Sequence, residues 1–143
     1  MRTQLTQDQI NHYQKDGFVI IRNFLSEEER AEMINAVTEC VIEHADTRII
    51  GDADIDGKKY NNNKDDFYAN VFLQKVNMWK VNKTIKKYML SPKIGEMVCK
   101  LAGIEGVRVW HDQTLQKKPW ANPTAFHLDT PYWSFSNRNA ISI

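Results

Sequence analysis

The pattern of polar and apolar positions predicts a helix near the N-terminus, followed by a strand. Thr6 and Gln9 stand at the spacing of a capping box, and Gly17 follows as a typical helix stop. Directly after it, the apolar run of residues 18–24 contains β-branched side chains and has the length of a buried strand. The opening of the chain is therefore expected to be a helix followed by a strand.

A second helix is predicted after this strand. Ser26 and Glu29 repeat the capping-box spacing, and acidic residues fill the first turn, where they complement the helix dipole. The helix is expected to run to about Ala45 and to bury one apolar stripe. The stripe consists of Met33, Ile34, Val37, Val41 and Ile42.

The middle of the chain combines a polar stretch with shorter elements. Residues 47–66 are rich in Asp, Asn and Lys and are expected to form a surface loop. A strand or two is expected within 67–79, and a short helix within 82–90. A clearer helix has Ser91 as its N-cap and Gly103 past its end. Its predicted buried face consists of Ile94, Met97, Val98 and Leu101.

Towards the C-terminus the pattern becomes extended. Residues 107–115 alternate as a strand does, and further strand candidates lie at 124–133 and 139–143. One face of the first strand would hold Val107, Val109, His111, Gln113 and Leu115. Because helices lead and strands follow, the fold class is predicted to be α+β. We expect one domain over residues 1–143, with a helical front end to about residue 105 and strands from about 106.

Composition narrows the functional classes. The 143 residues suffice for one domain, and a formal net charge of +1 gives no electrostatic case for nucleic acid or an anionic membrane. No apolar run approaches the length of a membrane span, and no secretory signal is visible. Cys40 and Cys99 form no CxxC pair, so a reduced, cytoplasmic protein is expected.

One apparent metal motif is judged inactive. "DADIDG", from Asp52 to Gly57, matches the opening of an EF-hand loop, but its twelfth position is Asn63, where a bidentate Glu is needed. We expect an acidic surface loop that binds no calcium.

The strongest candidate chemistry lies in "PTAFHLDTPYW". In a strand, His127 and Asp129 point to the same face, so they could supply two of the three protein ligands of a two-His, one-carboxylate iron site. Phe126, Tyr132 and Trp133 suit the wall of a pocket, and we expect the pair to project into one cavity. A surface strand with two outward polar residues is the alternative.

The remaining histidines are weaker candidates. His12 and His44 are expected on helix surfaces, whereas His111 is a core or pocket residue rather than a ligand.

Three stretches together resemble the phytanoyl-CoA dioxygenase (PhyH) family of Fe(II)- and 2-oxoglutarate-dependent oxygenases. They are "LTQDQINHYQKDGFVIIRNFLSEEERAEM", "VRVWHDQTLQKKPW" and "FHLDTPYW". The resemblance implies N-terminal helices packed on a double-stranded β-helix, or jelly roll. It also implies Fe(II) on His127 and Asp129, 2-oxoglutarate and dioxygen as co-substrates, and hydroxylation of a small molecule.

The resemblance also implies roles for neighbouring residues. Lys118 matches the family's lysine that contacts 2-oxoglutarate, Gln113 resembles a pocket glutamine, and Trp133 resembles an aromatic near the substrate. Lys117 is the rival of Lys118, because by strand parity it shares a face with Gln113.

One departure from the family is expected to matter. Family members carry a distal His and an Arg downstream of the HxD motif, and neither follows Trp133 here at the family's distance. The chain is therefore expected to be an N-terminal portion with an incomplete jelly roll, which needs about eight strands. The alternative function is a non-catalytic, β-rich binding or interaction module.

Overall fold

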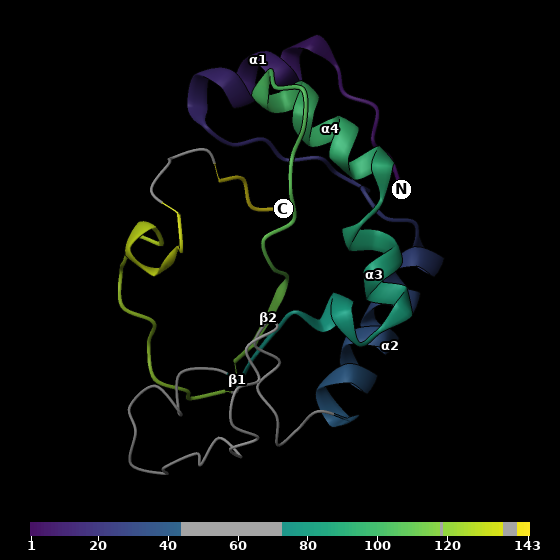
Figure 1. Cartoon of the computed structure of the whole chain (residues 1–143), viewed down its shortest axis with the longest axis vertical. Helices are drawn as coiled ribbons and strands as arrows, with labels where there is room; N and C mark the ends of the chain where they lie inside the picture. Colours follow the sequence, from purple (N-terminus) through teal and green to yellow (C-terminus); the bar gives the residue numbers. More distant parts are fainter. Residues whose placement is uncertain (44–72, 118, 136–139) are drawn as a thin grey trace.

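The computed structural model describes residues 1–43, 73–117, 119–135 and 140–143 (Figure 1). In chain order the described elements are α1 (Gln7–Asp16), α2 (Glu27–Glu43), β1 (Leu73–Val76), the 3-10 helix η2 (Met78–Lys80), α3 (Lys83–Met89), α4 (Pro92–Ala102), β2 (Gln113–Gln116) and the 3-10 helix η3 (Thr130–Tyr132). This mixture confirms the α+β class. The predicted 47–66 loop, its EF-hand-like motif and His44 lie outside the described residues.

Local capping explains where the first two helices begin. At α1, the Gln9 N–H donates to Thr6 Oγ1 and the Thr6 N–H donates to Gln9 Oε1, which completes the predicted capping box. Ser26 and Glu29 make the same reciprocal pair at α2. Gly17 ends α1 in the left-handed region, with φ of 79°. These predictions are confirmed.

Two small hydrophobic cores hold the helices together. In the first, α2 packs against η2 and α3; in the second, α4 packs against the N-terminal segment, and Figure 1 shows α1 running alongside α4. The first core contains Ala36, Cys40, Met78 and Ile85, and the second contains Ile94, Met97 and Val98. Both cores therefore lie in the helical part of the chain.

The predicted buried face is confirmed for α4 and partly wrong for α2. All four residues predicted for α4 are buried, because they form one stripe along the helix that the N-terminal segment and the stretch after α1 help to cover. For α2 the stripe was partly wrong: Ile34 and Ile42 are exposed, and Ala36 and Cys40 are the buried residues. The reason is that η2 and α3 contact the side of α2 that carries these two small side chains.

The strands are fewer and shorter than predicted. β1 and β2 form an antiparallel pair, from Leu73 opposite Gln116 to Val76 opposite Gln113. The strands expected at 18–24 and 124–133, the start of the strand expected at 107–115, and the described part of 139–143 have no strand structure, so those predictions were wrong. A strand needs a ladder of backbone hydrogen bonds to a neighbouring strand. Among the described residues these stretches make only single bonds of this kind, from the Arg2 N–H to the Phe24 carbonyl and from the Asn77 N–H to the Asp112 carbonyl. The jelly roll stays a prediction.

Membrane insertion through a helix finds no support in the described residues. None of the helices there is both long and apolar enough to cross a bilayer.

Candidate metal centre

His127 and Asp129 lie next to each other, although no strand places them there. His127 belongs to an irregular segment, and Asp129 is the residue that precedes η3. The distance from His127 Nε2 to Asp129 Oδ1 is 3.3 Å, and the two side chains are 60% and 61% exposed. The predicted adjacency is present, but the enclosing cavity is not, because neither side chain is buried.

The imidazole of His127 is oriented by its own backbone neighbourhood. Its Nδ1 lies 2.8 Å from the carbonyl oxygen of Ala125, which can only accept, so Nδ1 carries the hydrogen of that contact and Nε2 faces Asp129, either as a protonated N–H or with its lone pair. A lone pair facing a carboxylate is favourable only when a cation, either a proton or a metal, lies between them. A backbone carbonyl on the second ring nitrogen is the usual support of a metal-binding histidine.

The donor atoms are spaced as two ligands of one metal would be. Two donors that are each about 2.1 Å from a common ion, at roughly a right angle, are about 3 Å apart. The observed 3.3 Å between Nε2 and Oδ1 fits that arrangement with little movement. One nitrogen and one carboxylate oxygen also fit two positions of a non-heme iron site.

A third protein ligand is missing from the described part of the chain. No group of three His, Cys, Asp or Glu side chains there could hold a metal ion. His12 instead pairs with Asp16 along α1 at 2.9 Å, and the ring of His111 packs against Trp110. His12 therefore lies on the exposed surface of α1, as predicted.

Two of the residues predicted to contact 2-oxoglutarate, Gln113 and Lys117, lie at the two ends of β2. Gln113 begins the strand, and its Oε1 accepts a hydrogen bond from Gln74 Nε2 on β1 at 3.0 Å. Lys117 follows the strand, and its Nζ donates to Thr124 Oγ1 at 3.2 Å, which ties the strand end to the segment that leads to His127. Lys118 lies outside the described residues, so the choice between the two lysines stays a prediction.

The aromatic residues around the pair divide into packed and exposed groups. Trp133 stacks on Phe135, and Trp110 meets Phe135 edge-on, with both centroid distances at 5.3 Å. Phe126 is 103% exposed, so its predicted place in a pocket wall was wrong. Its flanking segment is irregular, and nothing in the described chain covers it. The Tyr132 side chain is outside what the structure describes.

One buried polar residue was missed by the sequence analysis. Asp112 is 8% exposed, and its Oδ1 accepts the Trp79 backbone N–H at 3.3 Å. Burial, the largest influence, raises the pKa of its carboxyl group. The alternating pattern of residues 107–115 predicts one face of odd-numbered side chains, so it does not single out the even-numbered Asp112. No motif in the sequence marks it.

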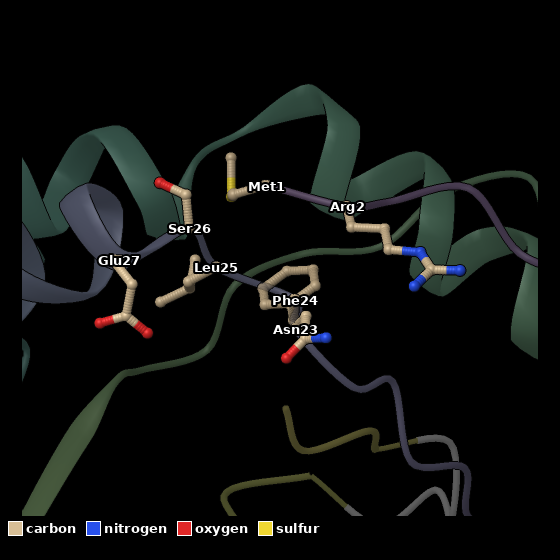
Figure 2. A pocket seen from close by; sticks show the side chains of 7 residues that line it. All are labelled: Met1, Arg2, Asn23, Phe24, Leu25, Ser26 and Glu27. Carbon is tan, nitrogen blue, oxygen red and sulfur yellow. The ribbon is translucent and has the colours of Figure 1, made fainter.

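A depression of the surface lies away from the pair of His127 and Asp129. An open hollow of about 440 Å³ lies beside the start of α2, and Figure 2 shows the side chains that line it. It is lined by Met1, Arg2, Asn23, Phe24, Leu25, Ser26 and Glu27. Neither His127 nor Asp129 contributes to it, so it is separate from the candidate metal centre.

Comparisons with known proteins add one positive finding. The family model described as Phytanoyl-CoA dioxygenase (PhyH) matches residues 13–143, which is most of the chain. No curated protein and no solved structure matches it.

Proposed function

Because the chain belongs to the phytanoyl-CoA dioxygenase (PhyH) family, we propose that it is an Fe(II)- and 2-oxoglutarate-dependent oxygenase that uses His127 and Asp129 as metal ligands. The observation that carries the proposal is the 3.3 Å pair of donor atoms, with Ala125 holding the second ring nitrogen of His127. When bound, Fe(II) would supply the coupling of dioxygen reduction and 2-oxoglutarate decarboxylation to hydroxylation of a small molecule.

The protein's own residues have separate tasks in this proposal. His127 and Asp129 would hold the metal through one nitrogen and one carboxylate oxygen. Lys118, or its rival Lys117, offers an ammonium group to a carboxylate of 2-oxoglutarate, and the Gln113 amide lines the same space. Trp133 offers a ring to the substrate. These side chains would be carried by a jelly roll with the helical region, residues 1–105, as its front end.

The site needs a third donor beyond those two. The described residues supply one nitrogen and one carboxylate, whereas a complete facial site has three protein ligands. This shortfall is the observation that favours the alternative function, a non-catalytic binding module. The two functions differ in whether the pair binds Fe(II) and whether 2-oxoglutarate strengthens that binding.

An anaerobic calorimetric titration with Fe(II), with and without 2-oxoglutarate, tests the proposal. We expect saturable binding that tightens with 2-oxoglutarate and is lost in His127→Ala and in Asp129→Ala. His12→Ala is the matched control, because His12 is also a partly exposed histidine beside a carboxylate, at 2.9 Å. Equal Fe(II) affinity in all four proteins would contradict the proposal.

Turnover is a second readout. Succinate release that requires Asp129 would show that the full site assembles in solution. Fe(II) binding without succinate release would favour the binding module.

A further inference from the structure

Four aromatic rings form a row between the stretch that leads into β2 and the segment that contains η3. The Trp110 ring lies against His111, with centroids 4.2 Å apart, and meets Phe135 nearly perpendicularly at 5.3 Å. Phe135 in turn stacks on Trp133, also at 5.3 Å, with 19° between the ring planes. Phe135 is therefore the central ring, because it contacts aromatic residues of both stretches.

Both contacts of Phe135 have geometries that aromatic rings favour. Perpendicular and stacked pairs with centroids roughly 4.5–7 Å apart are stabilised beyond the gain from burial alone. Trp133 is two positions from Phe135, so their stacking fixes the chain locally. Trp110 is far from Phe135 in the sequence, so their contact joins two separate stretches. The Phe135 side chain is half-buried, which agrees with rings on two of its sides.

The ring row is connected to the candidate metal centre by one short turn of chain. Trp133 directly follows η3, and its backbone N–H donates to the Thr130 carbonyl at 3.3 Å. Asp129 directly precedes η3 and lies 3.3 Å from His127. Figure 1 shows η3 across the stretch between α4 and β2 from α2 and α3. The neighbour that faces η3 is therefore the stretch that carries Trp110.

Two kinds of contact thus have separate effects on the metal donors. The bond from His127 to the Ala125 carbonyl, and its closeness to Asp129, set the distance between the two donors. Neither contact reaches beyond the segment itself. The pairing of Phe135 with Trp110 determines where that segment lies relative to the rest of the chain.

We propose that Phe135 is a positioning residue for the candidate metal centre, whose ring anchors η3, and with it Asp129 and His127, to Trp110. The metal part of this inference rests on the proposed function, whereas the anchoring is a property of the metal-free protein. Without the ring, the two donors sample more orientations. Metal affinity then falls with the fraction of molecules in the binding-competent arrangement.

Backbone ¹⁵N relaxation of the metal-free protein tests the anchoring. In Phe135→Ala, the order parameters of the His127 and Asp129 amides should fall from about 0.85 to below about 0.6. Phe126→Ala is the matched control, because Phe126 directly precedes His127 but is 103% exposed. It should leave both order parameters unchanged. Unchanged values in Phe135→Ala, or an equal fall in Phe126→Ala, would overturn the proposal.

Two further substitutions separate a ring contact from simple filling of space. Phe135→Tyr keeps the ring and should retain the wild-type order parameters, whereas Phe135→Leu keeps apolar bulk without the ring and should lower them. Trp110→Leu should lower them as well, since it removes the other side of the contact. Helical circular dichroism should stay constant throughout, because both hydrophobic cores lie in the helical region. Wild-type order in Phe135→Leu would overturn the role of the ring.

An anaerobic calorimetric titration with Fe(II) measures the consequence at the metal. Phe135→Ala should bind Fe(II) about 3- to 10-fold more weakly than the wild type, a range that corresponds to the loss of one aromatic pair. Phe135→Tyr and Phe126→Ala should match the wild type. Equal affinity in Phe135→Ala and the wild type would overturn the positioning role. A wild type that binds no Fe(II) would instead contradict the proposed function, and the order parameters would still decide whether Phe135 anchors the pair.

Discussion

The helical region, residues 1–105, and the C-terminal region, residues 107–143, use similar apolar side chains in opposite ways. Leu101 of α4 is 3% exposed, whereas Leu128 is 75% exposed. An α-helix satisfies its backbone within itself, so it can pack its apolar stripe on any neighbouring surface. An extended segment needs a neighbouring strand before its side chains have a defined face. Most of the C-terminal region has no such neighbour in the described structure.

Polar contacts show the same contrast. In the helical region, the Tyr88 hydroxyl of α3 donates to Glu32 Oε2 of α2 at 2.6 Å, and Lys87 pairs with the same carboxylate. These groups are far apart in the sequence, so they fix one helix against another. The contacts of His127 are with Ala125 and Asp129, two residues away on either side. The candidate metal centre is therefore organised locally.

The largest expected difference in stability is between the same leucine-to-alanine substitution made at two positions. Leu101→Ala should lower the free energy of unfolding by about 2–5 kcal/mol, because it leaves a cavity in a buried face. Leu128→Ala should change it by no more than about 0.5 kcal/mol. Urea denaturation followed by circular dichroism measures both. A similar loss in the two variants would show that Leu128 is covered in solution, and the contrast between the regions would fail.

Removing a helix cap should have an intermediate effect. Thr6→Ala deletes the acceptor of the Gln9 N–H at the start of α1 and should cost about 0.5–2 kcal/mol. Thr124→Ala deletes only an exposed bond from Lys117 and should cost about 0.5 kcal/mol or less. The same denaturation measurement applies. Equal losses in the free energy of unfolding would mean that the Lys117–Thr124 hydrogen bond stabilises the fold as much as the cap does.

Titration of Tyr88 tests the contact between α2 and α3. The hydrogen bond to Glu32, and then burial, raise the pKa of Tyr88 to about 12. Its contribution to stability should be complete below about pH 10 and decline as pH rises towards about 12, because the unfolded chain ionises first. Ultraviolet titration should show a late tyrosinate component that disappears in Tyr88→Phe. Ionisation of every tyrosine in a single step with its midpoint near pH 10 would contradict this contact.

The smallest expected changes in stability come from replacing either of two exposed aromatic residues by glycine. Trp120 and Phe126 are 102% and 103% exposed, but only Trp120 has a positive φ, at 65°. Trp120→Gly should be neutral or stabilise the fold by up to about 1 kcal/mol, because glycine removes the left-handed strain. Phe126→Gly should cost about 0.5–1 kcal/mol through backbone entropy. Thermal unfolding measures both; equal shifts of the same sign would show that the Trp120 conformation is not populated.

Much of the helical region was predictable because its signals are local. The capping boxes at Thr6 and Ser26, and the glycine stop at Gly103, depend on residues within a few positions of each other. The adjacency of His127 and Asp129 was predictable for the same reason, although the strand thought to produce it is absent. The choice between Lys117 and Lys118 as the proposed contact of 2-oxoglutarate was not predictable, since it depends on which face the chain presents after β2.

The sequence by itself determined where α1 and α2 begin, where α1 and α4 end, the buried stripe of α4, and the adjacency of His127 and Asp129. Each follows from bonds or spacings within one or two turns of chain. Only the tertiary structure decided that Ala36 and Cys40 form the buried side of α2, and that Asp112 is enclosed where α2, β1 and β2 meet. Burial is a property of what packs against a residue, and segments distant in the sequence supply those neighbours.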